Sequence, residues 1–565
     1  MKASEQPCSQ PGAAPEPTTR PESAPRSGWW RSEWASNLIL VAAFLPITLP
    51  NLWAGKWRHS LFQLLLWLAV FGCRRWAALS LLPFYLATPI LTFVSQHYGP
   101  ADLDLLSSIR GSSSFSEKLA FFQIIPASYY ALYCLILVPV LAYLALRGSP
   151  RPQTPAPIRW VCLLAAGGIF LGWWVSSYRL KWQGDTWFAS VLVEHLGRYQ
   201  PLGLPVSLTL TALDADGQQE ATLQRGDFRY NATSPEKLDT VVFVVGESSR
   251  ADHWHLNGYA RPTTPKLESI PHLISFSHLL SLAPNTVLSW PFLFTPKVAG
   301  NSAHWPTQKS FISAFKEAGY STAFVSFCMD QTSTRRDPLA IIAFEADRVV
   351  NGCASSGPRS TDMAMLPDIR QILAAQGPKL VVISTQGSHI GFERKSLSGY
   401  DVFQPSVLTG TKTREGWLNG YDNTIRLTDD FLASIVAQLQ ALGGRTVLFY
   451  VSDHGLACCD PGERFLGQAF TKPEYRPACI AWASKAFLDN PSAQTRFQFG
   501  AQHAASPVTT EYILHSFLDL CGLQTSRLDS SKSLFSSDLV MPQNRRVEDF
   551  QGHWLEFDQV PDTAD

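Results

Sequence analysis

Three short apolar runs in the second half of the chain each lead into side chains that could hold a metal ion or a phosphoryl group. The runs with their polar ends are DTVVFVVGES (239–248), KLVVISTQGSH (379–389) and TVLFYVSDH (446–454). Glu247, Asp453 and His454 carry the carboxylate and imidazole groups that zinc accepts as ligands, and manganese with less preference. A lone histidine such as His389 is more often structural, but three such clusters together predict a metal site.

The elements expected to position these groups are strands and helices in alternation. The three runs are rich in β-branched and aromatic residues, as is typical of strands buried on both faces of a mostly parallel sheet. Between and after them lie stretches with helical periodicity, notably 421–442 and 509–520. The pattern predicts an α/β domain in which the polar clusters gather beyond the carboxyl ends of the strands.

The first third of the chain predicts an all-α transmembrane bundle of about five helices. Apolar stretches lie at 35–54, 59–73, 76–96, 119–146 and 158–178. The first, third and fifth reach the roughly 20 residues that cross a bilayer. Arginine clusters fall on one side of five spans, which the positive-inside rule places in the cytoplasm. An even number of spans with a cytoplasmic domain is the alternative, and the arginine pattern disfavours it.

This pattern divides the chain into five parts. They are a disordered cytoplasmic tail (1–34), the transmembrane domain (35–180), a linker (181–238), an outer catalytic α/β domain (239–545) and a C-terminal tail (546–565). The 46 basic and 46 acidic residues give a formal net charge of zero, without a polybasic block. Composition therefore predicts membrane lipids as partners and no nucleic acid.

Six cysteines fall in the outer part of the chain. They are Cys328, Cys353, Cys458, Cys459, Cys479 and Cys521. An even number in an oxidising compartment permits three disulfides, whose pairing the sequence leaves open. A zinc-thiolate site is the rival interpretation, but no CxxC spacing supports it.

Five segments follow one another along the chain: VVGESSRADHWHLNGYARPTTPKL, SLAPNTVLSWPFLF, GSHIGF, GYDNTIRLTDDFL and YVSDHG. In wording and in order they resemble the lipid-dependent phosphoethanolamine transferases of bacterial inner membranes, within the sulfatase and alkaline-phosphatase superfamily. The resemblance implies a sulfatase-like α/β domain in the periplasm, after five spans in the inner membrane. It also implies that Glu247, Thr286, Asp453 and His454 form a zinc shell, with Thr286 as the nucleophile.

Two further residues receive roles from the same resemblance. His389 matches a family histidine near the phosphoryl group, and we expect it to contact substrate and act in catalysis there. Ser248 is expected to shape the turn after the strand or to hydrogen-bond a ligand. NGYARPTTP is expected to set a loop and a helix start, and GYDN (420–423) to pack or cap its helix.

The reaction implied by the resemblance has two steps. Thr286 attacks the phosphorus of phosphatidylethanolamine, diacylglycerol leaves, and the phosphoethanolamine on threonine passes to a glycolipid or glycan. Lipid A, the lipopolysaccharide core and a periplasmic glucan remain open as acceptors. Alternatives are a phosphoglycerol transferase with the same ligands and a degenerate, non-catalytic docking protein. An arylsulfatase is disfavoured because no Cys or Ser in a C/S-x-P-x-R context stands at position 286.

The sequence departs from the family at several positions. Leu456 and Leu466 stand where family members carry a glutamate and a histidine that serve a second metal, so we expect one metal rather than two. Leu282 and Phe292 stand where lipid A-modifying members carry cysteines around the nucleophile. The segment SFCMDQ (326–331) also differs from the sequence usual at the family's donor pocket. These departures leave the acceptor open.

Overall fold

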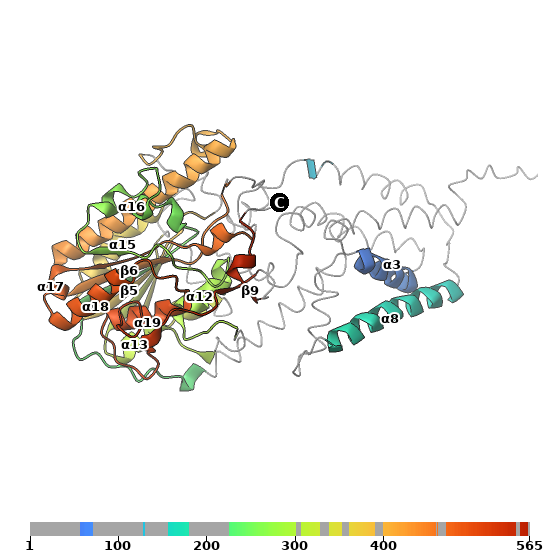
Figure 1. Cartoon of the computed structure of the whole chain (residues 1–565), viewed down its shortest axis with the longest axis horizontal. Coiled ribbons are helices and arrows are strands. Elements are labelled where there is room, and N and C mark those ends of the chain that lie inside the picture. The colour runs from blue at the N-terminus through green and yellow to red at the C-terminus, as the bar shows by residue number, and fades with distance from the viewer. Residues whose placement is uncertain are drawn as a thin grey trace, which may run out of the picture.

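The computed structural model describes two helices from the first third of the chain and most of the chain after residue 225 (Figure 1). The described residues are 57–71, 128–129, 131, 156–179, 225–300, 307–327, 338–352, 361–389, 399–458, 460, 470–549 and 554–562.

A seven-stranded sheet forms the centre of the α/β domain. Its strands are β1 (Thr240–Gly246), β2 (Leu273–Ser275), β3 (Ser321–Ser326), β4 (Arg348–Asn351), β5 (Lys379–Ser384), β6 (Thr446–Ser452) and β7 (Cys479–Ala483). They run in the order β2-β7-β6-β1-β5-β3-β4. The pairs among β6, β1, β5, β3 and β4 are parallel, whereas β7 and β2 add antiparallel pairs at one side. The three strands predicted from the sequence are thus neighbours, and their carboxyl ends meet.

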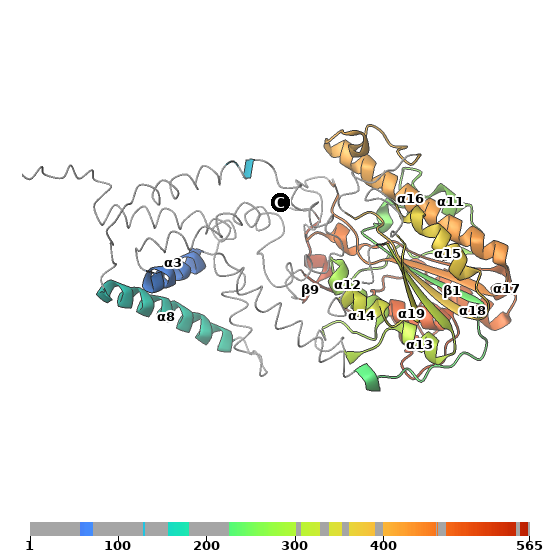
Figure 2. The ribbon, with the colours of Figure 1, turned by 180° about the vertical axis from the view of Figure 1, so that it is seen from behind.

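Helices cover both faces of this sheet (Figures 1 and 2). They are α11 (Pro265–Glu268), α12 (Thr286–Phe294), α13 (Phe311–Glu317), α14 (Pro338–Ala343), α15 (Leu366–Leu373), α16 (Arg414–Leu442), α17 (Lys485–Leu488), α18 (Pro491–Gln502) and α19 (Glu511–Leu520). Alternate residues of β1 serve the two cores: Phe243 packs with α12, α13 and α19, and Val244 with α15 and α16. The apolar stripe expected on 421–442, including Phe431 and Ile435, is buried against the sheet. The predicted α/β architecture is confirmed.

The segment expected as a C-terminal tail is instead folded onto the domain. It forms an antiparallel hairpin of β8 (Arg546–Glu548) and β9 (Trp554–Glu556), followed by a 3₁₀ turn over Phe557–Gln559. Val547, Phe557 and Val560 are buried in a small apolar cluster with Leu280 and Tyr475. The folded domain therefore extends beyond residue 545.

Two helices from the first third of the chain pack against each other. In α3 (Trp57–Phe71) and α8 (Ala156–Arg179), Arg159 Nε donates to the carbonyl of Ala69 at 2.8 Å, and the rings of Phe62 and Phe170 stack at 6.3 Å. They overlap the predicted spans at 59–73 and 158–178. Within the described ranges, no helix has both the length and the apolarity required to cross a bilayer. The predicted spans at 35–54 and 76–96, and most of 119–146, lie outside the described residues.

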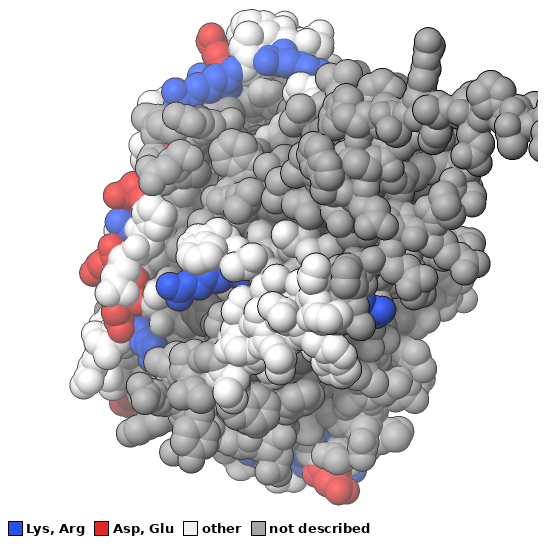
Figure 3. Space-filling model, turned by 90° about the vertical axis from the view of Figure 1, so that its right-hand side faces the viewer, with Lys and Arg blue, Asp and Glu red and all other residues white. Residues whose placement is uncertain are grey.

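Seen from the side on which α3 and α8 lie, the described charged residues gather mainly along the rim of the molecule, and uncharged residues lie nearer its centre (Figure 3).

Two cysteines of the outer part, Cys479 and Cys521, are buried in the apolar core as free thiols. Burial raises the pKa of both thiols well above its usual value. Three disulfides among the six cysteines would require Cys479 and Cys521, so that prediction is wrong. Cys328, Cys353 and Cys459 lie outside the described residues.

Candidate metal centre

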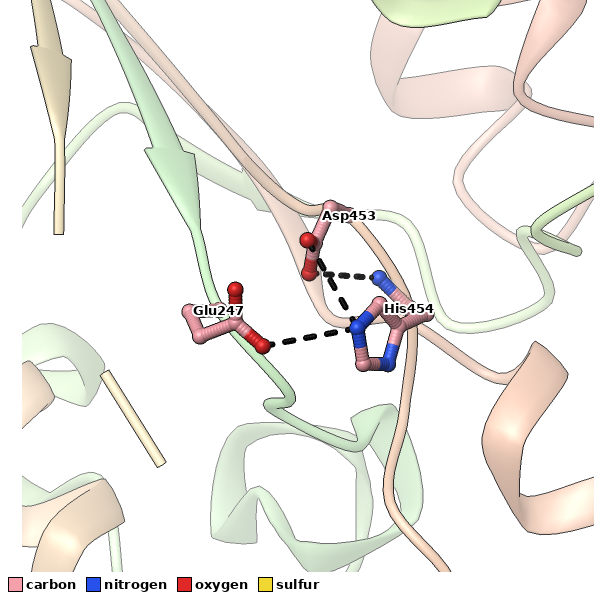
Figure 4. A group of neighbouring side chains, drawn as sticks. All are labelled: Glu247, Asp453 and His454. Carbon is pink, nitrogen blue, oxygen red and sulfur yellow. Dashed lines mark hydrogen bonds and ion pairs between the residues drawn. The ribbon is translucent and has the colours of Figure 1, made fainter. Parts of the chain in front are cut away.

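The ends of β1 and β6 bring three ligand groups into one small volume (Figure 4). Gly246 pairs with Ser452 in the parallel register, so that Glu247 follows one strand and Asp453 and His454 follow the other. One ligand atom from each of the three residues lies within 4.8 Å of the others, and all three residues are buried. The predicted convergence of these groups is therefore present in the folded chain.

The contacts among these groups fit a cation. His454 Nε2 lies 3.4 Å from Glu247 Oε1 and 3.6 Å from Asp453 Oδ2. His454 Nδ1 donates to the carbonyl oxygen of Gly455 at 2.6 Å, so Nε2 is the ring nitrogen left to bind a metal. Asp453 Oδ2 is buried without a hydrogen-bond partner. A carboxylate oxygen without a hydrogen-bond partner, beside an imidazole nitrogen whose other ring nitrogen is held by a backbone carbonyl, is the arrangement expected of zinc ligands.

Burial and neighbouring charges shift the pKa values of the three groups in different directions. Burial opposes the charge of Glu247, but the hydrogen bond and charge of His454 outweigh it and lower the pKa of Glu247. Burial and repulsion by Glu247 raise the pKa of Asp453. For His454, burial is outweighed by the charges of Asp453 and Glu247, which raise its pKa. Two buried carboxylates therefore compete for positive charge, which a divalent cation supplies.

Thr286 lies at the first position of α12 and points its hydroxyl at the same group. Its Oγ1 donates to Glu247 Oε2 at 2.9 Å and lies 3.4 Å from His454 Nε2. The Asn285 side chain caps the helix by accepting from the amide of Leu288 at 3.0 Å. Thr286 is half-buried, whereas the three ligand residues are buried, so it lies on the accessible side of the group.

The segment before α12 is tied directly to the metal ligands. The hydroxyl oxygen of Ser281 lies 2.8 Å from the carbonyl oxygen of Asp453 and 2.7 Å from that of Ala283, so its single proton can be donated to either. Neither Ser281 nor Asn285 stood out in the sequence. A serine or asparagine before a helix is a recognisable capping signal, but the contact with Asp453 depends on a distant strand.

Ser248 shapes the turn that presents Glu247. It adopts a left-handed backbone conformation with φ of 58°, its hydroxyl donates to Glu247 Oε1 at 2.6 Å, and its amide lies 3.3 Å from Asp453 Oδ1. Gly246 leaves room for Tyr450 of the neighbouring strand, because a Cβ at position 246 would overlap the Tyr450 hydroxyl. Of the two expectations for Ser248, the turn is the one that these contacts match.

His389 lies on the turn after β5, beside the group but outside the three closest ligands. Ser388 donates its amide to the carbonyl of Glu247 at 2.9 Å, and the charge of His389 contributes to lowering the pKa of Glu247. The carboxylate of Asp362 holds this turn by accepting from the amides of Gln386 at 2.7 Å and Gly387 at 3.0 Å. Asp362 was missed from the sequence, because it stands in no motif.

A second buried carboxylate, that of Asp422, has its hydrogen-bond positions filled by other side chains of the protein. We call it the Asp422 cluster, made of His253, Tyr259, Arg261 and Asp422. Asp422 is fully buried and accepts from His253 Nδ1 at 2.8 Å, the Tyr259 hydroxyl at 3.0 Å and Arg261 Nη1 at 2.9 Å. The segment GYDN therefore packs, as expected, and joins α16 to the loop that follows β1.

The loop after His454 carries the expected substitution. Leu456 is buried at 1% exposure, and its carbonyl lies 3.4 Å from Arg250 Nη1. Arg250 also pairs with Asp460 at 2.5 Å and with Asp252 at 2.8 Å. Leu466 lies outside the described residues. At position 456, an apolar side chain offers no ligand to a second metal.

Comparison with known proteins matches residues 239–523 of this chain to the sulfatase family. A curated relative, the Kdo(2)-lipid A phosphoethanolamine 7''-transferase of Escherichia coli (strain K12), is 25% identical over 48% of this chain and 49% of its own length. The phosphoethanolamine transferase EptC of the same strain is 26% identical over 57% and 58%. The chain thus spans about half the length of the curated relatives it matches.

Two solved structures share the fold. The C-terminal periplasmic domain of EptC from Escherichia coli, in complex with Zn, has a TM-score of 0.52 at 22% identity and covers 59% of this chain and 97% of that chain. The integral membrane protein lipooligosaccharide phosphoethanolamine transferase A from Neisseria meningitidis has a TM-score of 0.59 at 19% identity, covering 80% and 86%. At these identities the likeness shows the fold.

Proposed function

Because the chain belongs to the sulfatase family, we propose that it is a zinc-dependent phosphoethanolamine transferase with Thr286 as its nucleophile. The observation that carries the proposal is the Thr286 hydroxyl, 2.9 Å from Glu247 and 3.4 Å from His454 at the opening of a buried ligand group. The transferred group is inferred from the curated relatives, which are named phosphoethanolamine transferases. The donor is phosphatidylethanolamine, and the acceptor is lipid A, lipopolysaccharide core or a periplasmic glucan.

Glu247, Asp453, His454 and Thr286 would hold the zinc ion. Zinc bound there would favour the alkoxide of Thr286 and offset the negative charge that gathers at phosphorus. The choice of zinc follows from the mixed carboxylate and imidazole ligands and is supported by the Zn complex of the EptC domain. Manganese is less suited to the imidazole of His454.

The two proposed steps exchange one ester at a time. In the first, Thr286 loses its hydroxyl proton and Oγ1 bonds to phosphorus, while the bond from phosphorus to the diacylglycerol oxygen breaks and that oxygen takes up a proton. In the second, an acceptor hydroxyl loses its proton and its oxygen bonds to phosphorus, while the bond to Thr286 breaks and Oγ1 takes up a proton. His389, on the turn after β5, is proposed to contact the phosphoryl oxygens or to protonate the leaving oxygen. The first turn of α12 offers backbone N–H groups to the anion.

The donor is a membrane lipid, which fits a chain anchored beside the headgroup layer. We propose that the catalytic domain lies in the periplasm and that the first third of the chain anchors it in the inner membrane. The expectation of five spans and the likeness in fold to an integral membrane protein support this location.

Peptide mass spectrometry tests the proposal most directly. The purified full chain is incubated with phosphatidylethanolamine and zinc, beside a Thr286→Ala control. A phosphoethanolamine adduct on the peptide that contains Thr286, absent from the control, is the expected result. An adduct formed only from phosphatidylglycerol would make the chain a phosphoglycerol transferase. A protein that binds no zinc and acquires no adduct from either lipid would be a docking protein instead.

A further inference from the structure

Helix α12, which carries Thr286, is poorly stabilised by its own sequence. It has nine residues and contains Pro291, which lacks the N–H needed for an intrahelical hydrogen bond. Helices this short are marginal on their own, so contacts with the rest of the domain must fix the direction of α12. One face supplies such contacts, because Trp290, Leu293 and Phe294 pack into the core beneath the sheet.

The C-terminal hairpin covers the other side of the segment that contains α12. The ring of Trp554 in β9 meets the ring of Phe292 edge-on, with centroids 6.0 Å apart. The amide of Glu548 in β8 donates to the carbonyl of Leu282 at 2.7 Å, four residues before Thr286. The hairpin thus contacts the chain on both sides of the nucleophile.

A buried charge pair forms a third contact just beyond the end of α12. Lys297 Nζ lies 3.9 Å from Glu548 Oε2 and 4.0 Å from the centre of the Phe292 ring. Both side chains are about 5% exposed. Glu548 Oε2 has no hydrogen-bond partner, and burial shifts the pKa of each group towards its neutral form. Shifting the hairpin along the helix would leave each buried group without its partner, so the pair favours this register between hairpin and helix.

The hairpin is itself firmly attached to the domain. The Tyr475 hydroxyl donates to the carbonyl of Glu548 at 3.0 Å, and the amide of Lys472 donates to the carbonyl of Pro561 at 2.8 Å. Val547, Phe557 and Val560 are buried beside Leu280 in the same apolar cluster. The hairpin can therefore act as a brace.

We propose that hairpin β8–β9 is a positioning element that sets the place of Thr286 through the buried pair Glu548–Lys297 and the contact of Trp554 with Phe292. For the reaction, the inference rests on the proposed role of Thr286. Glu548, Lys297 and Trp554 are positioning residues, since none of them lies among the metal ligands. A nucleophile displaced by about 1 Å loses up to roughly 100-fold in rate, so the brace affects turnover more than substrate binding.

The test uses full-length variants and two independent measurements. The double variant Lys297→Met/Glu548→Gln removes both buried charges at similar volume, which avoids leaving one charge alone. Trp554→Leu removes the ring contact. Glu556→Gln is the matched control, because its ion pair with Arg546 lies on the same hairpin but is exposed. Hydrogen exchange of the peptide over 282–294 reports the brace, and the rate of adduct formation on Thr286 reports its consequence.

We expect exchange over 282–294 to become about ten-fold faster in both test variants, with β1 and β6 unchanged. The maximal rate of adduct formation should fall about ten-fold at unchanged KM and zinc content. Unchanged exchange in zinc-binding, folded variants would overturn the inference, whether or not the chain is a transferase. Faster exchange in a chain whose Thr286 never acquires an adduct would support the brace and refute the proposed reaction.

Discussion

The metal centre and the Asp422 cluster are two buried acidic groups that each include residues of the segment after β1, and they differ in their hydrogen bonds. Every oxygen of Asp422 accepts from a side chain of the protein, namely His253, Tyr259 or Arg261. At the metal centre, Asp453 Oδ2 accepts no hydrogen bond, although it is fully buried.

The difference separates a group that stabilises the fold from one that serves a ligand. A carboxylate whose partners all come from the chain contributes to folding, and removing it leaves those partners unpaired. A carboxylate with an orphaned oxygen costs stability until something else occupies the place. Burial and charge look alike in the two groups, so the hydrogen-bond count is the informative observation.

Asp453→Asn is expected to give the largest effect. It keeps the shape of the side chain but removes a charged ligand, so the rate of adduct formation on Thr286 should fall by about 10³-fold or more. The free energy of unfolding of the metal-free protein should stay the same or rise, because repulsion with Glu247 disappears. Urea unfolding and peptide mass spectrometry measure the two quantities. A large loss of stability in this variant would contradict the comparison.

Asp422→Asn is expected to do the reverse. Its side-chain amide cannot accept from all three donors, and Arg261 loses its buried counter-charge, so the variant should lose about 3 kcal/mol of stability. Zinc content should remain that of the unmodified protein in the fraction that folds. Urea unfolding with metal analysis checks both, and a stable variant that has lost zinc would show that the Asp422 cluster serves the metal.

Zinc should stabilise the protein through the metal centre and not through the Asp422 cluster. At a free concentration 100 times Kd, a ligand that binds only the folded state adds about 2.7 kcal/mol, and a chelator should remove that increment. Glu247→Gln should abolish the response, whereas Tyr259→Phe, which alters only the Asp422 cluster, should keep it. Thermal unfolding with and without zinc provides the measurement.

His515 contributes its own pH dependence to the free energy of unfolding, and this contribution must be subtracted before the two clusters are compared at different pH. Burial and the charge of Lys532 lower the pKa of His515 to about 4, and its Nδ1 accepts from the amide of Asp529 at 3.2 Å. The unfolded chain takes up this proton near pH 6.5, so stability is retained above that pH and lost as pH falls towards 4. The loss between pH 7 and pH 5 should be about 2 kcal/mol. His515→Gln should flatten this slope in urea unfolding, and an unchanged slope would contradict the assignment.

The sequence predicted the parts of the fold that depend on local pattern. Runs such as TVVFVV and TVLFYVS read as strands because their residues suit burial on both faces, and ligands at adjacent strand ends must then converge. The convergence of Glu247, Asp453 and His454 followed from that rule. The place of Thr286 came from the resemblance, since a threonine before an apolar helix has no distinctive spacing.

The remainder depended on contacts between distant segments. Asp362 reaches the His389 turn, and the hairpin at 546–556 reaches α12, without any periodic signal in either segment. Cys479 and Cys521 were counted as possible disulfide partners, yet both thiols lie in the core, Cys479 from strand β7 and Cys521 from the position just after α19. Leu282 and Phe292, where the resembling family carries cysteines, prove to be two of the points that the hairpin touches.

The parallel pairing of β1 with β6 also dictates when the centre can exist. Ser248 and Asp453 are 205 residues apart in sequence although they lie on adjoining strand ends. At about 5–20 residues per second, a ribosome needs roughly 10–40 s to make the chain between them. Throughout that interval Glu247 is present without its partners, and contacts of such long range form late in folding. Binding of the proposed zinc ion thus has to wait until the strand that ends at Ser452 has joined the sheet.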